Sequence, residues 1–397
     1  MSRRARQLTT IVGALAALVI AGCAPGDGTG VPTAPAERAA ASAIKKWEVN
    51  AAADWTDRAT DLNVRTPVNV ARMYAYLSLA QLRAAEDAQA VRPHPPVGAA
   101  IGAASAAVLE TYFPAFTAEI EAALDAQSTA EPWPGAKHQD FAAGEAIGRA
   151  AAARVVAYSA GDGVGLTNPG LPPATPGHWL YTVGGPLARG YLGARPFFLA
   201  SGDEFRSPPP PAFGSPEFLA ALGEVRDIVL NRTPEQLTIA QFWNVNQSGS
   251  SAAAPERLAV ELLRRHRSGE AESARILFVM NAAIYDAQVG CFDAKYHYWL
   301  IRPAQADPVI AAHLAFPAPP HPSYPSAHSC VSGAYAGVLA ASFPDETDRL
   351  TALAHEASVS RVYAGIHYRF DGEAGLTLGG AVARKALAAD LDAVAVR

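Results

Sequence analysis

Residues 273–292 read SARILFVMNAAIYDAQVGCF, and this segment has the spacing of an amphipathic helix. Its apolar side chains recur three or four positions apart and so share one helical face: Ile276, Met280, Ala283, Ile284 and Ala287. Residues 71–90 repeat the spacing, and further helices are expected over 99–109, 116–126, 140–159, 215–230 and 254–266. Alternating runs of β-branched residues are nearly absent. The sequence therefore predicts an all-α fold.

A short internal similarity bears on how these helices are grouped. A shift of 203 residues gives four matches, which place Ala71-Arg72, Ala80 and Ala84 on Ala274-Arg275, Ala283 and Ala287. Two related four-helix bundles would explain this match, and chance in Ala-rich helices explains it about as well. Between Gly161 and Phe213 lies a Pro/Gly-rich stretch that also contains several aromatic residues. We expect it to form a long loop packed over the bundles.

The overall composition indicates a globular protein. Half of the 397 residues are apolar and 17% are charged, so the chain can bury enough surface to offset the entropy of ordering. A net charge of -5 without a basic block gives no reason to expect a nucleic-acid partner. Three cysteines are too few for a disulfide scaffold. Cys291 and Cys330 could pair outside the cytoplasm, or could be two buried free thiols.

The N-terminus predicts export. Residues 1–10 carry three arginines, and the apolar run over 11–22 is too short to span a bilayer. The sequence Ile20-Ala21-Gly22-Cys23 resembles a bacterial lipobox, which implies cleavage before Cys23 and lipidation of its thiol. An ordinary signal peptide with an incidental cysteine is the alternative.

These features divide the chain into three parts. We expect residues 1–22 to be a lipoprotein signal peptide, 23–42 a flexible tether, and 43–397 one all-α domain whose motif-bearing core covers about 254–397. The expected location is exported, either periplasmic or lipid-anchored to the outer face of a bacterial membrane.

Three segments near the C-terminus carry the charged and histidine side chains that point to chemistry. The first, 295–303, places two cations seven residues apart. On a helix Lys295 and Arg302 would share a face about 10.5 Å apart along the axis, and both could reach one anion. Pro303 would help to end that helix. Taken alone, such a pair is more often a solvated stripe.

The second segment, PSYPSAHS at 322–329, precedes a helix-like run. With Pro325 in the first helical turn, the backbone N–H groups of Ala327 and His328 would be unpaired donors at the positive end of the helix dipole. Ser326 adds a hydroxyl group, and His328 adds a proton donor. Taken alone, this is a common way for a helix to begin.

The third segment, 360–371, contains His367 and Asp371 four residues apart, where they would be neighbours on a helix surface. A carboxylate there can keep one ring nitrogen as N–H and leave the other as a lone pair, as a nucleophile or ligand imidazole requires. Arg361 adds a cation. Taken alone, the pair is more often a plain surface contact.

Together the three segments supply every part of one oxyanion site. Three cations, Lys295, Arg302 and Arg361, suit a highly charged tetrahedral anion. Ser326 and the Ala327 N–H add hydrogen bonds. The remaining groups are His367 to attack or ligate, Asp371 to orient it, and His328 to handle the proton on the opposite side.

The ordered pattern Lys-x6-Arg-Pro, Pro-Ser-Ala-His and Ser-Arg-x5-His-x3-Asp resembles the superfamily of type 2 phosphatidic acid phosphatases (PAP2) and vanadium-dependent haloperoxidases. A weaker likeness to the soluble bacterial haloperoxidase-like branch extends over most of the mature chain. The resemblance implies a helix-bundle fold with an oxyanion pocket. The family usually has Gly where Ala327 stands. The backbone N–H survives this change, although a methyl group now lies near the ligand.

The resemblance implies one of two reactions. In a haloperoxidase, His367 would ligate vanadate, His328 would help to bind peroxide, Lys295 would polarise it, and a halide would be oxidised. In an exported acid phosphatase, His367 would form a phosphohistidine from a phosphomonoester, His328 would protonate the leaving group, and no cofactor would be needed. We expect the haloperoxidase, because the body is exported without spanning segments and the motifs are rich in aromatic residues.

His321 lies five residues before Ser326. In the family this position is His in algal bromide-oxidising enzymes and Phe in fungal chloride-oxidising ones, which implies bromide or iodide in preference to chloride. A loop histidine exposed to water is the alternative. The expected partners are hydrogen peroxide and halide, or a phosphomonoester, and the membrane through a lipid anchor only. A homodimer is a further option that the family implies.

Two other classes fit the sequence less well. A zinc hydrolase is disfavoured because neither His-Glu-x-x-His nor Cys-x-x-Cys occurs, and because three cations would repel a dication. An exported lipoprotein that only captures phosphate would need neither His328 nor His367.

Overall fold

The computed structural model describes residues 50–128, 141–181, 190–244 and 253–394, and it confirms the all-α fold. Within these residues the only β-type pairing is an isolated bridge between His178 and Leu300. The expected signal peptide, tether and lipidated Cys23 lie outside the described residues, up to residue 49, and stay predictions. None of the helices described in the structure combines the length and the apolar character that a membrane crossing requires.

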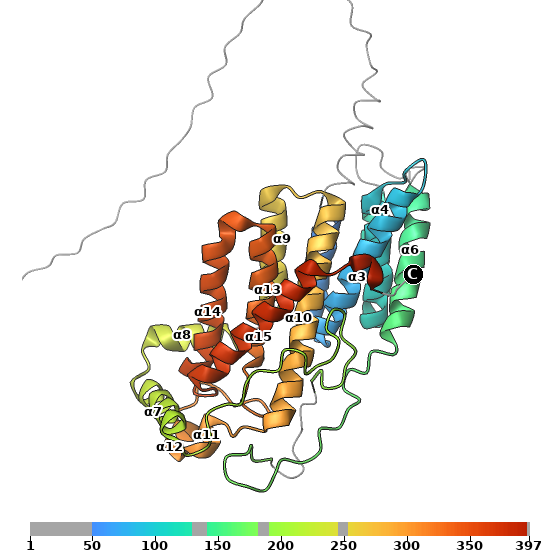
Figure 1. Cartoon of the computed structure of the whole chain (residues 1–397). Helices are drawn as coiled ribbons and strands as arrows, with labels where there is room; N and C mark the ends of the chain where they lie inside the picture. The colour runs from blue at the N-terminus through green and yellow to red at the C-terminus, as the bar shows by residue number, and fades with distance from the viewer. Residues whose placement is uncertain (1–49, 129–140, 182–189, 245–252, 395–397) are drawn as a thin grey trace, which may run out of the picture.

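The first group of helices surrounds one apolar core that is rich in alanine (Figure 1). It consists of α2 (Ala51–Arg65), α3 (Val70–Ala90), α4 (Val97–Tyr112), α5 (Thr117–Ser128) and α6 (Phe141–Ser159). Small residues bring α4 and α6 together, since a Cβ added at Gly148 would lie 2.1 Å from the Ala100 carbonyl oxygen.

The helices of the second group contain part of each motif, and the remaining motif residues lie in the segments between these helices. It consists of α9 (Ala254–His266), α10 (Glu270–Tyr298), α13 (Ala327–Ser342), α14 (Thr347–Tyr363) and α15 (Arg369–Ala388). The long helix α10 packs against both α3 and α13, so it joins the two groups (Figure 1). Four shorter helices lie beside the motif segments: α7 (Pro216–Asn231), α8 (Pro234–Phe242), α11 (Pro303–Ala306) and α12 (Pro308–Ala312).

The two groups repeat one local arrangement. Helix α4 is capped by Phe113 before the short 3-10 helix Pro114–Phe116, and α13 is capped by Phe343 before the 3-10 helix Pro344–Glu346. A Cβ added at Gly379 of α15 would lie 2.1 Å from the Cys330 carbonyl oxygen, which repeats the close approach of α6 to α4. This repetition supports the interpretation of two related bundles.

The Pro/Gly-rich stretch packs over the bundles, as the sequence predicts, in its described parts 161–181 and 190–213. Buried Asp286 on α10 accepts hydrogen bonds from three consecutive backbone N–H groups of this loop, those of Phe197, Phe198 and Leu199, at 2.8, 2.7 and 3.1 Å. Trp179 stacks on Trp299, with ring centroids 6.5 Å apart. One buried carboxylate and one aromatic pair therefore fasten the loop close to the motifs.

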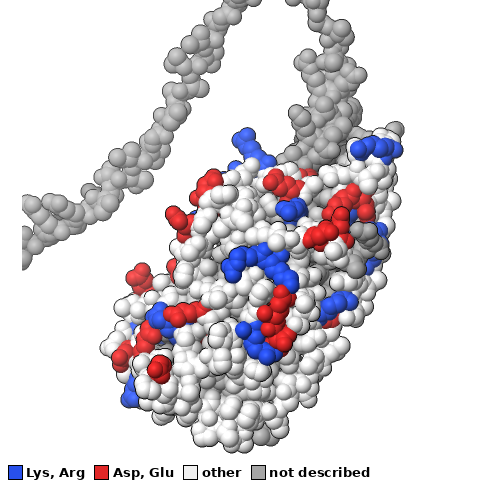
Figure 2. All heavy atoms as spheres, viewed as in Figure 1, with Lys and Arg blue, Asp and Glu red and all other residues white. Residues whose placement is uncertain are grey.

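The surface charges are mixed on the face shown in Figure 2, where basic and acidic side chains lie beside one another. Ion pairs in the structure include Arg206 with Asp293 and Lys385 with Glu204. The charges that matter most to the motifs are buried instead, since Lys295, Arg302 and Arg361 are each at most 2% exposed.

Candidate functional site

The first motif does not continue a helix, which corrects the expectation that Lys295 and Arg302 share a helical face. Helix α10 ends at Tyr298, where Trp299 takes a left-handed conformation (φ 53°) and its N–H bonds to the Lys295 carbonyl at 2.9 Å. Arg302 then becomes the N-cap of α11, with Pro303 at the first position of that helix. The chain reverses between the two cations, so they approach the site from separate elements.

The second motif begins its helix later than the sequence predicts. Ser326 is the N-cap of α13 and Ala327 its first residue, so Pro325 precedes the helix and does not lie in its first turn. An N-cap serine ordinarily accepts an N–H from the first turn. The Ser326 hydroxyl makes no such bond, is fully buried, and has no hydrogen-bond partner among the described residues.

The third motif brings His367 and Asp371 together without a shared helix. Helix α14 ends at Tyr363, Gly365 turns the chain with a φ of 82°, and α15 begins only at Arg369. His367 therefore lies in the turn before α15. Its Nδ1 is 2.7 Å from Asp371 Oδ2, and its Nε2 is 3.0 Å from Arg302 Nη1.

Asp371 fixes the orientation of this histidine. Its Oδ2 also accepts the Ser323 hydroxyl at 2.6 Å and the Tyr368 N–H at 3.2 Å, and its backbone carbonyl accepts the Ser326 N–H at 2.9 Å. Because an ionised carboxylate can only accept hydrogen bonds, Nδ1 of His367 carries the proton and Nε2 presents a lone pair. Motifs two and three are thus joined through one side chain.

Lys295 differs from its expected position at the oxyanion. Its ammonium group is fully buried and donates to three backbone carbonyls, those of Pro322, Ser323 and Pro325, at 2.9, 2.9 and 2.5 Å. An ammonium has three donors, and all three are used within the protein. Lys295 therefore fixes the loop in front of α13 and adds positive charge from behind it.

Arg302 connects the first motif to both neighbouring histidines. Its Nε donates to the His321 carbonyl at 3.0 Å, its Nη2 lies 3.0 Å from His321 Nδ1, and its Nη1 donates to the Ile366 carbonyl at 2.7 Å. Guanidinium only donates, so this contact favours an acceptor at His321 Nδ1, whereas the Pro322 carbonyl oxygen 3.1 Å from the same nitrogen favours a donor there. His321 is 8% exposed, so it is not a water-exposed loop residue.

A backbone carbonyl that the sequence analysis did not identify lies next to the site. The Trp243 oxygen accepts a hydrogen bond from Arg361 Nη1 at 2.8 Å and from His328 Nε2 at 3.0 Å. The Trp243 indole donates to Glu356 Oε1 at 3.0 Å, which holds the end of α8 in place. Every residue has a carbonyl, so only the fold could reveal this contact. It keeps the proton of His328 on Nε2 and leaves Nδ1 as an acceptor.

These residues enclose a cavity of about 530 Å³. Five of the nine candidate residues line it: His321, Ala327, His328, Arg361 and His367. The other four, Lys295, Arg302, Ser326 and Asp371, are buried and contact the lining residues or their loop. The three motifs therefore converge on one cavity wall, although the lysine does not contribute a free donor to it.

The electrostatics of this wall favour an anion. Burial and the neighbouring cations lower the pKa of His321, His328 and His367 well below 6.5, so the three rings are neutral near pH 7. Burial also lowers the pKa of Lys295 to about 8 and that of Arg361 to about 9. A bound anion would lower the free-energy cost of keeping these buried cations charged.

The unsatisfied donors fit a tetrahedral oxyanion. The Ser326 hydroxyl and Arg361 Nε are buried without a hydrogen-bond partner among the described residues. The N–H groups of Ala327 and His328 belong to the first turn of α13 and have no intrahelical acceptor. Beside them lies His367 Nε2, whose lone pair accepts a hydrogen bond from Arg302 Nη1 at 3.0 Å in this structure and would have to exchange that bond for a bound oxyanion.

The two cysteines beneath this wall are free, buried thiols, which is the second of the two alternatives for them. The Cys291 thiol lies 3.7 Å from the Pro325 carbonyl oxygen. It is therefore packed against the same loop that Lys295 fixes.

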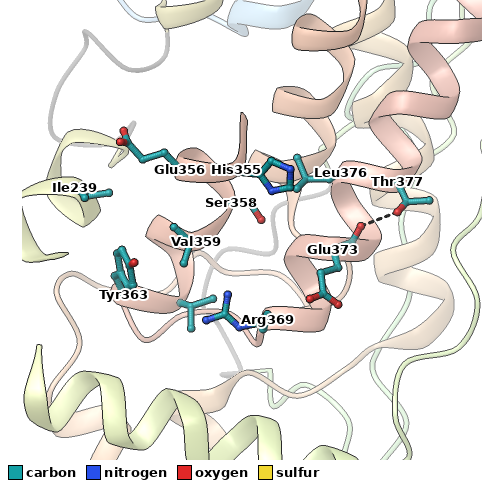
Figure 3. Close-up of a pocket in the computed structure, with 11 residues that line it drawn as sticks. Ile239, His355, Glu356, Ser358, Val359, Tyr363, Arg369, Glu373, Leu376 and Thr377 are labelled. Carbon is teal, nitrogen blue, oxygen red and sulfur yellow. Dashed lines mark hydrogen bonds between the residues drawn. The ribbon is translucent and has the colours of Figure 1, made fainter. Parts of the chain in front are cut away.

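A second cavity of about 630 Å³ lies between α8, α14 and α15 and contains no candidate residue (Figure 3). Two of its charged groups are engaged: Glu356 accepts the Trp243 indole, and Arg369 pairs with Glu224. Through Glu356 this cavity adjoins the Trp243 segment that contacts the site.

Comparison with known proteins places this geometry in a family. Residues 274–392 match the model of the PAP2 superfamily. A bacterial vanadium-dependent iodoperoxidase is similar at 25% identity with a TM-score of 0.70, over 84% of this chain and 95% of that chain. A bacterial vanadium-dependent chloroperoxidase in its apo-type structure is 14% identical with a TM-score of 0.59, over 80% of this chain and 92% of that one.

The holo-type structure of a bacterial vanadium-dependent chloroperoxidase is also 14% identical, with a TM-score of 0.58 over 84% of this chain and 91% of that one. At this identity the likeness to the chloroperoxidases concerns the fold alone. No curated protein matches the chain. Residues 274–392 are therefore similar to the PAP2 superfamily, and the described chain has the all-α fold seen in the vanadium-dependent haloperoxidases.

Proposed function

We propose that the protein is a vanadate-dependent haloperoxidase that oxidises a halide with hydrogen peroxide. The observation that carries this proposal is that the unsatisfied buried donors Ser326 Oγ and Arg361 Nε lie in the same site as an unprotonated His367 Nε2, which among the described residues only Arg302 contacts, in a chain similar over 84% of its length to an iodoperoxidase. In this reaction the halide loses two electrons, peroxide is reduced to water, and a hypohalous acid is formed.

The chain's own residues would divide the work as follows. His367 Nε2 would ligate vanadate, and Arg361, the Ser326 hydroxyl and the N–H groups of Ala327 and His328 would bind its oxygens. Bound vanadate would supply the Lewis acid that activates peroxide toward halide. Asp371 orients the histidine, while Lys295 and Arg302 position the loop and the ring and add positive charge.

His328 would act as the proton acceptor. Its Nε2 proton is committed to the Trp243 carbonyl, and its lowered pKa leaves Nδ1 unprotonated near neutral pH. A ring in this state can take a proton from incoming hydrogen peroxide. This tautomer favours the haloperoxidase over a phosphatase, whose leaving group needs a proton donor.

We propose that His321 tunes the halide and favours bromide or iodide over chloride. Its ring lines the cavity, and Arg302 and the Pro322 carbonyl both contact Nδ1, so Nε2 is the nitrogen left for an anion and donates to it in the tautomer that the Arg302 contact favours. Phe292 packs edge-on against the ring at 5.4 Å between centroids and limits its rotation. An N–H donor in a buried, positively charged wall suits a halide.

Reconstitution with vanadate tests the proposal. We expect iodide and bromide oxidation that depends on both vanadate and peroxide, and we expect His367→Ala to abolish it. His297→Ala provides the control, because His297 is exposed on α10 away from the cavity lining. Full turnover by His367→Ala, or equal loss in the control, would contradict the assignment.

A PAP2-type acid phosphatase is the second candidate, favoured by the match of the motif region to the PAP2 superfamily. In that reaction His367 Nε2 would attack phosphorus and form a phosphohistidine, and His328 would have to gain a proton before it could protonate the leaving oxygen. Hydrolysis of p-nitrophenyl phosphate that vanadate only inhibits would support this candidate.

We also propose that the protein is exported and lipidated at Cys23. The support is the lipobox-like sequence alone, because Cys23 lies outside the described residues. A Cys23→Ser variant should lose incorporation of a labelled fatty acid, and unchanged labelling would refute the assignment. A homodimer stays a prediction from the family.

A further inference from the structure

A glutamate in the same cavity plays no part in the proposed oxyanion chemistry. Glu256, in the first turn of α9, lines the cavity and is only 3% exposed. Its Oε2 has no hydrogen-bond partner among the described residues. Its carboxyl group accepts its own backbone N–H, which is an ordinary contact at the start of a helix. That contact does not give the second carboxyl oxygen a hydrogen-bond partner.

Because Glu256 is buried, its carboxyl group holds its proton to a higher pH. Among the described residues Glu256 forms no ion pair, and burial raises its pKa to about 8. Near neutral pH it is therefore mainly a neutral carboxylic acid that can donate one hydrogen bond and accept others. A group of this kind inside a cavity recognises a neutral polar ligand better than it recognises an ion.

The position of Glu256 separates it from the oxyanion wall. Its charge acts on Tyr335 of α13, which lies seven residues beyond His328, and α9 packs beside α13 and α10 (Figure 1). Seven residues of α-helix span about 10.5 Å. His328, Val331, Ser332 and Tyr335 all line the cavity over this length. Its volume of about 530 Å³ leaves room for a small organic molecule beside the oxyanion site.

The walls of this space are apolar with a few polar points. Ile284, Gln288 and Phe292 recur every four residues along α10 and line the cavity together. Gln288 Oε1 also lacks a hydrogen-bond partner in the described part of the chain. An apolar stripe interrupted by unpaired acceptors suits a ligand with an apolar body and a hydroxyl group. The buried cations Lys295, Arg302 and Arg361 disfavour a cationic ligand.

We propose that Glu256 and Gln288 form a second subsite that binds the hydroxyl group of a neutral aromatic acceptor, a phenol, with its ring between α10 and α13. This inference rests on the proposed haloperoxidase function, in which such an acceptor is halogenated. It makes the cavity a place where the acceptor is held about two helical turns from His328, so oxidised halide is formed beside it.

Binding of phenol and of its methyl ether, anisole, to the vanadate-free protein tests the subsite without any turnover. We expect NMR titration near neutral pH to show that wild type binds phenol at least about tenfold more tightly than anisole. Glu256→Leu should remove this preference. Glu217→Gln is the matched control, because Glu217 also accepts its own N–H in the first turn of a helix but is exposed.

Equal binding of phenol and anisole by wild type, or absence of binding by both, would overturn the subsite. So would a preference that survives in Glu256→Leu. If that variant fails to fold, Gln288→Leu tests the same wall, because Gln288 is only half-buried, and an unchanged preference there contradicts the proposal. Triiodide formation needs no organic acceptor, so its absence would identify a failure of the proposed function itself.

Discussion

At the scale of single residues, the protonation and orientation of the His367 ring are set mainly by one neighbour, Asp371. One carboxylate oxygen of Asp371 receives three hydrogen bonds, and one of them fixes the ring nitrogen that carries the proton. Burial raises the pKa of Asp371 to about 6, while the Ser323 hydroxyl and the cations Lys295 and Arg302 lower it. The carboxylate is therefore ionised at neutral pH, although it is fully buried.

Replacing this carboxylate is the sharpest test at the residue scale. Asp371→Asn keeps the size of the side chain but can present an N–H to His367 Nδ1, which disfavours the required tautomer. We expect vanadate affinity to fall by at least about tenfold, measured by equilibrium dialysis, with little change in the thermal midpoint. Glu373→Gln, exposed on the same helix, should bind vanadate as wild type does. Wild-type affinity in Asp371→Asn would contradict the orienting role.

The sequence identified these residue types correctly but not the backbone beneath them. His367 and Asp371 do meet, yet through a turn and an N-terminal helical position, because Gly365 and the end of α14 intervene. Spacing alone cannot distinguish an i, i+4 pair on a helix from a pair across a turn. The contact of Trp243 with His328 and Arg361 left no signal in the sequence, since it uses a backbone oxygen.

At the scale of elements, helix α13 contributes through its first turn. Ala327 is its first residue, and the preceding Ser326 has φ -72° and ψ 120°, a conformation that also suits a residue before proline. Proline is well tolerated at this helical position because its N–H would be unpaired in any case. The oxyanion contact can therefore be removed without breaking the helix.

This allows a test of one backbone donor. Ala327→Pro deletes the N–H and should weaken vanadate binding by roughly tenfold or more, while helix content measured by circular dichroism is retained. Ala327→Gly keeps the N–H, restores the residue usual in the family, and should bind vanadate within about threefold of wild type. Unaltered affinity in Ala327→Pro would show that this N–H does not contact the anion.

The sequence predicted the helices that bury one apolar face, but it did not predict where the chain reverses between them. The long helix α10 includes the expected segment 273–292, but it extends to Tyr298 and ends in a left-handed Trp299 that no propensity rule favours. Tertiary contacts explain that ending, since Trp299 packs against Trp179 and Tyr296. The correct assignment of Lys295 needed this ending, because it directs the ammonium group toward the loop at 322–325.

At the scale of the whole molecule, buried ionisable groups govern stability against pH. Burial raises the pKa of Glu256 to about 8 and that of Asp286 and Glu270 to about 7, so the native state keeps protons that the unfolded chain has released. Raising the pH across this range therefore lowers the free energy of unfolding, by at most about 1.4 kcal/mol per pH unit for each group. The buried histidines act oppositely below about pH 6.5.

We expect the free energy of unfolding in urea to be greatest near pH 6.5, where the opposing effect of the histidines ends, and to fall as the pH rises to about 8, the highest of these carboxyl pKa values. Glu256→Gln cannot lose a proton, so its alkaline fall should be shallower than that of wild type, whereas Glu217→Gln should follow wild type. Parallel curves for Glu256→Gln and wild type would show that this carboxyl group is not protonated in the native state near neutral pH.

The central claim is that one cavity wall uses its unpaired donors and His367 to activate peroxide through vanadate. The most direct measurement compares bromide oxidation and p-nitrophenyl phosphate hydrolysis on one preparation, before and after vanadate is added. We predict that peroxide-dependent bromide oxidation arises in proportion to bound vanadate and that phosphate ester hydrolysis is negligible throughout. Efficient hydrolysis that vanadate only inhibits, without any halide oxidation, would contradict the account.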